Sequence, residues 1–148
     1  MIEQLDQTFA TVKVSHEITE QRVRDLLCSA WEGGSSYWCA CVCVDREVPP
    51  AALETIKAIK AERLATIGDG SFYSHEYPFI DGVTLKLEVA EMEEEGVKSL
   101  DRAALITGLQ VMADKYPRQF HDFLIENDDA ETGDIYLQCC LFGEAIFG

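Results

Sequence analysis

Seven polar and aromatic residues, divided between two distant stretches of the chain, have the side chains that a ligand site would need. The early stretch WEGGSSYWC supplies an acid and two aromatic rings, and the late stretch around TGD supplies hydroxyl, acid and amide groups. If the two stretches pack together, the rings would form a stacking wall and the polar groups would direct hydrogen bonds at a polar ring or a cationic ligand. The predicted ligand-binding residues are Glu32, Tyr37, Trp38, Thr132, Asp134, Gln138 and Glu144.

Most of these residues also have an ordinary structural interpretation. Tyr37 and Trp38 can be anchors of a hydrophobic core. Thr132 can cap a helix, and Asp134 can be a favourable charge in a first helical turn. Glu32 has no such explanation in the sequence, so it is the residue that most strongly indicates a function.

The cysteines and histidines do not form a recognisable metal-binding motif. On a strand, alternate cysteines of CACVC (39–43) lie roughly 6.7 Å apart, whereas two thiolates on one zinc ion must approach about 4 Å. A zinc site completed by Cys139, Cys140 or His75 remains an alternative to buried, reduced thiols that act as small hydrophobic side chains. We therefore predict no metal and no cofactor.

Catalytic motifs are also absent from the sequence. It contains no GxGxxG, no Walker-type glycine loop, no HExxH and no calcium loop. The sequence therefore favours a binding protein over an enzyme, and we assign no catalytic residue. The remaining enzymatic alternative is a metal-dependent hydrolase, which would require Glu32, Asp134 and Glu144 to converge within a few ångströms.

The charge of the chain restricts its partners. The 148 residues carry a formal net charge of −15, which disfavours direct binding to a nucleic-acid backbone and favours basic partner proteins. Acidic residues gather in the segments 91–96 and 126–134, although solvated loops of a soluble protein would have the same composition. The predicted acidic interaction surface consists of Glu91, Glu93, Glu94, Glu95, Asp128, Asp129 and Glu131.

The amino-terminal sequence lacks a basic region followed by an apolar run, and no stretch has about 18 consecutive apolar residues. The six cysteines are clustered instead of being spread like a disulfide framework. These features predict a cytoplasmic protein that does not enter a membrane. Self-association into a homo-oligomer stays open.

Hydrophobic patterning and end signals predict the secondary structure. Thr19 is expected to cap a helix that ends near Gly33 and Gly34, Pro49 and Pro50 to start a second helix, and Asp101 a third. A short helix is expected from Pro117, and a last apolar segment over 135–147 should pack in the core. Strands are expected at 9–18, 37–44, 71–77 and 83–90, with 37–44 as a central strand.

Together these elements predict an α+β fold, with about four strands in a mainly antiparallel sheet packed against helices. The length and the 47% hydrophobic content predict a single compact domain over residues 1–148.

Two stretches also resemble a family of small, uncharacterised phage and prophage proteins. DLLCSAWEGGSSYW is similar to that family's AFEGGxxYW segment, and the tail from Leu100 is similar to its D-x-x-T-x-D…LQ…LFGE…G ending. This chain departs from the pattern at Trp31, where Phe or Leu is expected, and at Ser36, where Asn is usual. The resemblance covers about half of the chain and implies a phage setting, in which small acidic proteins often antagonise host defence by stoichiometric binding.

The leading functional hypothesis is therefore a non-enzymatic, phage-derived binding protein that engages a basic, nucleic-acid-handling host protein. The alternative is a protein that sequesters a small ligand or nucleotide signal in a pocket lined by Tyr37 and Trp38. Its negative potential argues against a multiply phosphorylated ligand.

Overall fold

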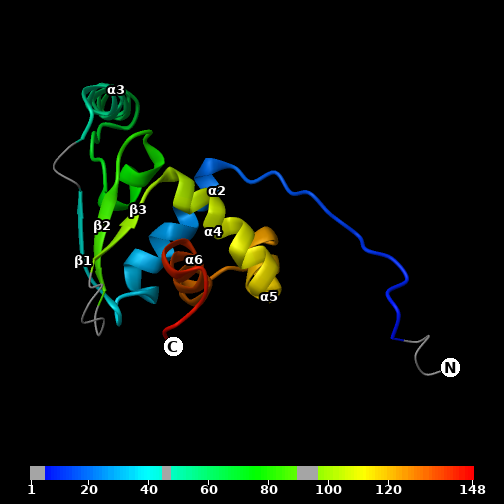
Figure 1. The fold of residues 1–148 in the computed structure, drawn as a ribbon. Helices are drawn as coiled ribbons and strands as arrows, with labels where there is room; N and C mark the ends of the chain where they lie inside the picture. Colours follow the sequence, from blue (N-terminus) through cyan, green and yellow to red (C-terminus); the bar gives the residue numbers. More distant parts are fainter. Residues whose placement is uncertain (1–5, 45–47, 90–96) are drawn as a thin grey trace.

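Helices make up most of the structure and pack beside a small antiparallel sheet (Figure 1). The computed structural model describes residues 6–44, 48–89 and 97–148, with the backbone alone at residues 40–44. In chain order, with the labels of Figure 1, the elements are α2 (Glu20–Ser29), η1 (Ala30–Gly34), β1 (Cys39–Val44), α3 (Pro50–Ile67), η2 (Ser74–Phe79), β2 (Leu85–Val89), β3 (Val97–Leu100), α4 (Arg102–Lys115), α5 (Pro117–Leu124) and α6 (Ala130–Phe142).

The prediction of an approximately four-stranded sheet is wrong. The described residues hold three strands in the order β1–β2–β3, joined by two antiparallel pairings. β1 pairs Val44 with Leu85 of β2, and β2 pairs Leu85 with Leu100 of β3. β1 is thus an edge strand of this sheet and not the predicted central one, although helix and sheet do occur together as expected.

Two predicted strands are not strands. Residues 9–18 run extended and pair with no strand of the described part of the chain. In place of the strand at 71–77, a 3₁₀ helix follows Tyr73, whose backbone N–H donates to the Glu76 carboxylate at 2.8 Å. Pro78 lies inside that helix and has no N–H for a sheet ladder. Alternating apolar residues therefore did not indicate strands here, because local capping and tertiary contacts determine the backbone conformation of these two segments.

The predicted helix ends are confirmed. Thr19 Oγ1 accepts a hydrogen bond from the Arg22 backbone N–H at 3.3 Å, and Asp101 Oδ1 accepts one from Ala104 at 2.9 Å. α3 begins at Pro50 and is capped at its carboxyl end by Gly68, whose φ of 74° is the left-handed conformation that favours glycine. The residues at the helix ends therefore set these boundaries, as the sequence indicated.

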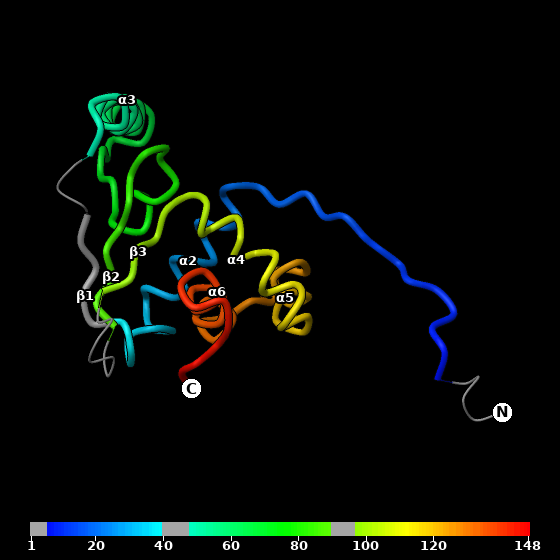
Figure 2. Tube along the Cα trace, in the orientation of Figure 1, coloured from blue at the N-terminus to red at the C-terminus, as the bar shows by residue number. Residues whose placement is uncertain are grey.

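The core lies where α2, α4 and α6 pack beside the sheet (Figure 2). Along β2 the buried Leu85, Leu87 and Val89 alternate with Lys86 and the exposed Glu88, as expected for a strand with one covered face. A smaller cluster holds α3 against the segment before β2. Within the described ranges, no helix has both the length and the hydropathy that a membrane span requires.

Candidate functional site

The two stretches that carry the predicted ligand residues meet where α2 and η1 cross α6. A Cβ atom added to Gly34 would lie 2.2 Å from the carbonyl oxygen of Ala130. One added to Gly133 would lie 2.8 Å from both the Ala30 nitrogen and the Leu26 carbonyl oxygen. The backbones therefore touch at this crossing, which only glycine permits, and the glycines of EGG and TGD serve this close approach.

Asp134 is the centre of the crossing. Its buried carboxylate accepts hydrogen bonds from Ser35 Oγ at 2.8 Å, Tyr37 Oη at 2.7 Å and Trp38 Nε1 at 2.6 Å. Three donors from one short segment after η1 thus compensate the burial of a residue that is only 6% exposed. The contact ties the beginning of β1 to α6.

Tyr37 is the exposed member of this group, with 54% of its surface accessible. Partial burial, the hydrogen bond to Asp134 and the negative charge of that carboxylate together raise the pKa of Tyr37 to about 12. The neutral phenol is therefore favoured in the folded protein, and its proton is held on the bond to Asp134.

This shift predicts an alkaline loss of stability. Because the folded-state pKa of Tyr37 lies above its ordinary value of 10, the stabilisation is complete below pH 10 and is lost as the pH rises towards about 12. Urea unfolding of the wild type and of Tyr37→Phe should show a stability difference that is constant below pH 10 and shrinks above it. A difference that does not change with pH would contradict the role given to this phenol.

Trp38 packs against the end of the chain. It is 1% exposed, and its ring stacks on Phe147 with centroids 5.3 Å apart and planes 6° apart. Gln138 holds this tail, because its Oε1 accepts hydrogen bonds from the Ile146 N–H at 2.7 Å and the Phe147 N–H at 2.8 Å. The expected aromatic stacking wall is thus covered by the protein's own carboxyl-terminal segment.

Thr132 and Asp129 form a reciprocal cap at the beginning of α6. The Thr132 N–H donates to Asp129 Oδ1 at 3.0 Å, and the Asp129 N–H donates to Thr132 Oγ1 at 3.4 Å. Hydrogen bonds from Thr132 lower the pKa of the Asp129 carboxyl below its usual value despite slight burial. Thr132 is therefore a capping residue, with Asp129 as the N-cap.

The two remaining predicted residues, Glu32 and Glu144, are exposed. Glu32 lies beside Cys28, whose thiol pKa is raised by burial and then by the hydrogen bond to Glu32, so this thiol is not activated as a nucleophile. Glu144 follows Gly143, which ends α6 with a φ of 72°. Glu32, Asp134 and Glu144 do not form a cluster that could hold a metal ion, and neither do any other described His, Cys, Asp or Glu residues.

The cysteines have different surroundings. Burial raises the pKa of Cys139 to about 11 and also raises that of Cys140, which keeps both α6 thiols protonated at neutral pH. The side chains of Cys41 and Cys43 lie outside the described residues, so the predicted CACVC strand is traced by its backbone only. Cys28, Cys139 and Cys140 are not joined in disulfides.

A small hollow beside the crossing was not predicted. It measures about 100 Å³ and is lined by Trp31, Ser35 and Ser36 among others. Trp31 Nε1 is a buried donor without a hydrogen-bond partner in the described part of the chain. Pockets for drug-sized ligands usually measure about 300–1,000 Å³. The hollow is therefore too small for a nucleotide.

Sequence reasoning also missed a second buried carboxylate, Glu76 in η2. Arg63 donates to it from both terminal nitrogens, at 2.5 and 3.0 Å, and Arg24 donates at 2.8 Å. Burial alone would raise the pKa of Glu76, but the Arg63 and Tyr73 hydrogen bonds and the two arginine charges outweigh it and lower the pKa below 4.5. The partners are far apart in the sequence, so no spacing indicated them.

This cluster predicts an acid-dependent loss of stability. Because the folded-state pKa of Glu76 is depressed, its stabilising contribution is present above pH 4.5 and is lost as the pH falls through the folded-state value. Wild-type stability should therefore decrease more steeply below pH 4.5 than that of Glu76→Gln, measured by urea unfolding. Parallel pH profiles of the two proteins would show that Glu76 is not the titrating group.

The predicted acidic surface is only partly within the described residues. Glu91, Glu93, Glu94 and Glu95 lie outside them. Asp128 is paired with Arg22 at 3.7 Å and its side chain is only 14% exposed, so it presents little charge to solvent. Asp129 and Glu131 are exposed at the beginning of α6.

Further exposed carboxylates lie close to this end of α6. Asp25 lies one helical turn before Ser29, which packs close to Gly133 of α6, and Glu32 lies in η1, whose Gly34 touches Ala130. The negative charge of Glu131 contributes to the raised pKa of Tyr37 on the other side of the crossing. Glu126 completes the group, with a side chain that is 75% exposed. We call this group the α2–α6 acidic surface, and it consists of Asp25, Glu32, Glu126, Asp129 and Glu131.

Comparison with known proteins gives no relative for this chain, because it matches no protein-family model, no curated protein and no solved structure. Its own contacts and charges are therefore the basis for inferring a function.

Proposed function

We propose that this chain is a non-enzymatic binding protein that uses the α2–α6 acidic surface to engage a basic protein. The observation that carries the proposal is that five exposed carboxylates lie on or next to the elements that meet at one helix crossing. The neighbouring basic side chain, Arg22, is already engaged by the Phe123 carbonyl oxygen and by Glu126 and Asp128. Glu126 is thus the one member of the surface that a described ion pair neutralises, and Asp25, Glu32, Asp129 and Glu131 present their charges to solvent.

The support beneath this surface favours recognition. Glu32 lies in η1, and Glu131 lies in the first turn of α6, so both sit on helices whose backbones touch through Gly34 and Gly133. The bonds to Asp134 hold the same crossing together. Charges on a rigid support bind with a smaller entropic cost than charges on a flexible loop.

The chemistry of the surface indicates the class of partner. Carboxylates on a chain with a net charge of −15 attract a basic patch over a long range and repel nucleic-acid phosphates. Basic grooves that bind phosphates are found in nucleic-acid-handling proteins. Together with the resemblance to phage proteins, this favours a stoichiometric antagonist of such a host protein, acting in the cytoplasm of the infected cell.

Two variants of equal net charge distinguish binding at this surface from attraction to the overall negative charge of the chain. The first, Asp25→Asn/Glu32→Gln/Glu131→Gln, removes three charges from the α2–α6 acidic surface. The matched control, Glu54→Gln/Glu62→Gln/Asp114→Asn, removes three exposed charges from α3 and α4. Asp25 and Asp114 each accept a hydrogen bond from a glutamine four residues earlier, so the two variants also lose comparable local contacts.

The measurement is the affinity for an arginine-rich peptide, determined by fluorescence anisotropy at increasing salt concentrations. The surface variant should bind about tenfold more weakly than the control, with a smaller dependence on salt, because each contact charge contributes a few tenths to about 1 kcal/mol. Equal affinities of the two variants would show that binding follows net charge alone and would overturn the proposal.

A further inference from the structure

The amino-terminal segment of residues 6–16, here called the arm, extends away from the rest of the molecule (Figure 1). Three apolar side chains of the arm are almost fully accessible: Phe9 is 103% exposed, Val12 82% and Val14 71%. At the base of the arm, the ring of His16 meets that of Phe120 with centroids 6.0 Å apart. The arm therefore presents apolar side chains that its own chain does not cover.

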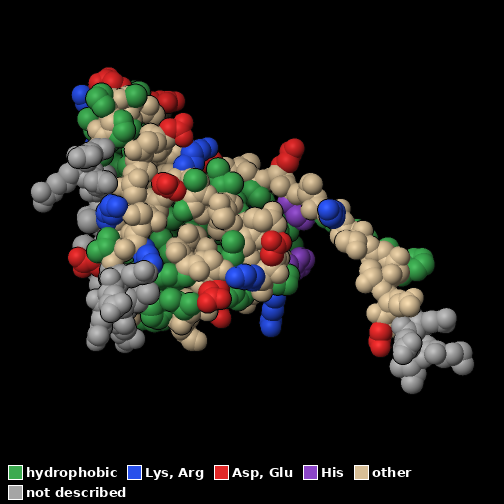
Figure 3. Space-filling model, viewed as in Figure 1, with side chains coloured by type: hydrophobic (Ala, Val, Ile, Leu, Met, Phe, Trp, Pro, Cys, Tyr) green, Lys and Arg blue, Asp and Glu red, His purple; other side chains and the backbone are tan. Residues whose placement is uncertain are grey.

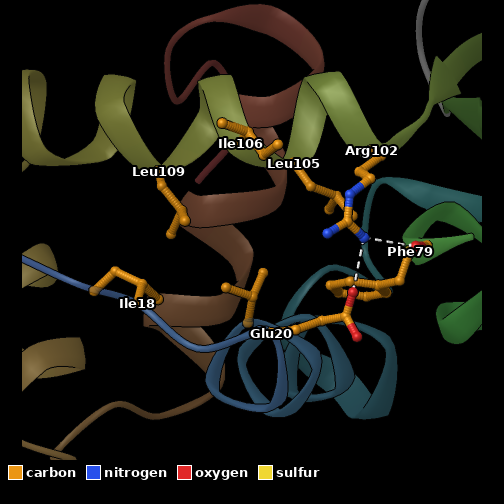
Figure 4. A pocket seen from close by; sticks show the side chains of 8 residues that line it. Ile18, Glu20, Phe79, Arg102, Leu105, Ile106 and Leu109 are labelled. Atoms are coloured by element: carbon orange, nitrogen blue, oxygen red, sulfur yellow. Dashed lines mark hydrogen bonds and ion pairs between the residues drawn. The ribbon is translucent and has the colours of Figure 1, made fainter. Parts of the chain in front are cut away.

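A groove with mainly apolar walls lies at the base of the arm, where Val14 and His16 of the arm form part of its wall. Two hollows of about 250 and 500 Å³ share the residues Ile18, Ile106 and Leu109, so they form one continuous depression along α4. Figure 4 shows these side chains with Leu105 around the first hollow. Ile106 is 62% exposed, and apolar atoms gather over this part of the surface in the space-filling view (Figure 3).

Arm and groove also differ in charge from the rest of the protein. The arm contains one acid, Asp6, and one base, Lys13, so its net charge is zero in a chain of −15. At the groove, Arg102 donates to Glu20 at 2.7 Å, so the charges there also cancel. A neutral, apolar pair of surfaces adds no like-charge repulsion at the contact itself, so only the long-range repulsion between the two acidic bodies opposes association.

We propose that two copies of this chain exchange arms, with Phe9 and Val12 of each arm seated in the α4 groove of the other copy. An extended arm of this length spans roughly 35 Å, enough to reach across to a second body. Arm and groove lie next to each other, so exchange about a twofold axis forms two equivalent contacts and closes the assembly at two copies. The dimer buries the arm side chains that are exposed in the single chain.

The first test measures molar mass by sedimentation equilibrium at micromolar concentration. The wild type should be dimeric. Phe9→Ser/Val12→Ser and Ile106→Asp should both be monomeric with unchanged circular dichroism, because all three side chains are exposed. The matched control Gln7→Ser/Thr11→Ser, which changes polar positions of the arm, should remain dimeric.

Mixing the two monomeric variants distinguishes exchange from other modes of dimerisation. The Ile106→Asp chain has an intact arm, and the Phe9→Ser/Val12→Ser chain has an intact groove, so the mixture should form a heterodimer with one native contact. Neither variant alone can form such a contact. The expected result is recovery of dimer in the mixture only, with affinity below that of the wild type.

Salt gives an independent readout. Dimerisation should strengthen as salt screens the repulsion between two chains of −15, whereas peptide binding to the α2–α6 acidic surface should weaken. A wild type that is monomeric throughout, a dimer that survives the arm substitutions, or a mixture that stays monomeric would each overturn the proposal. These outcomes leave the proposed function untouched, because the two surfaces are separate.

Discussion

The Gly34→Ala variant is expected to lose about 3 kcal/mol of unfolding free energy or more. The added Cβ would lie 2.2 Å from the Ala130 carbonyl oxygen and 3.2 Å from that of Ser29. Both neighbours are backbone atoms of packed helices, so the clash cannot be relieved by moving a flexible side chain. Such a loss is a large fraction of the roughly 5–15 kcal/mol by which a domain is stable. Urea unfolding at neutral pH measures it.

Gly68→Ala is the control for this prediction. Gly68 has a φ of 74° and no atom within 4 Å of an added Cβ, so it tests the conformational cost of alanine without a clash. That cost should be about 1 kcal/mol. If Gly34→Ala and Gly68→Ala proved equally stable, contact between the helix backbones would not be what requires glycine at position 34.

Asp134→Ala is expected to lose about 3 kcal/mol of unfolding free energy. The substitution leaves Trp38 Nε1 and Ser35 Oγ buried without their acceptor, and each unsatisfied buried donor costs roughly 1–3 kcal/mol. Tyr37 is exposed and can turn its hydroxyl to water, so it adds less. Chemical unfolding followed by the fluorescence of the two tryptophans gives the measurement.

Two further variants separate the contribution of the Asp134 acceptor oxygens from that of the Tyr37 hydrogen bond. Asp134→Asn keeps the shape and one acceptor oxygen, so its stability should lie between those of the wild type and Asp134→Ala. Tyr37→Phe removes only the exposed donor and should cost about 1 kcal/mol or less. A stable Asp134→Ala protein would contradict the structural role of this carboxylate and return it to consideration as a ligand contact.

The sequence predicted features that depend on neighbouring residues. The caps at Thr19 and Asp101 and the proline at the beginning of α3 are local signals, and the structure confirms them. β3 was missed because four residues, VKSL, carry too little pattern to be recognised as a strand. The arm has the alternation of a strand but pairs with none of the strands in the described ranges, and pairing is what a strand requires.

At the candidate site, the sequence indicated which residues could come together but not what they do there. The sequence analysis made the packing of the EGGSSYW and TGD stretches a condition of the site. In the structure Tyr37, Trp38, Asp134 and Gln138 do gather at the crossing of α2 and α6. The sequence could not show that Trp38 stacks on Phe147, because that contact joins residues 109 positions apart. Acids, amides and aromatic rings serve packing as well as binding, and only the three-dimensional partners distinguish these roles.

The measurement that tests the proposed function most directly is capture of a partner from an extract of the cells in which the chain is made. Wild type, the Asp25/Glu32/Glu131 surface variant and the Glu54/Glu62/Asp114 control are compared at low and high ionic strength. We predict one stoichiometric basic protein that wild type and control retain at low salt, that the surface variant loses, and that high salt releases. No stoichiometric protein at low ionic strength, or one held equally by the surface variant, would contradict a binding function of the α2–α6 acidic surface.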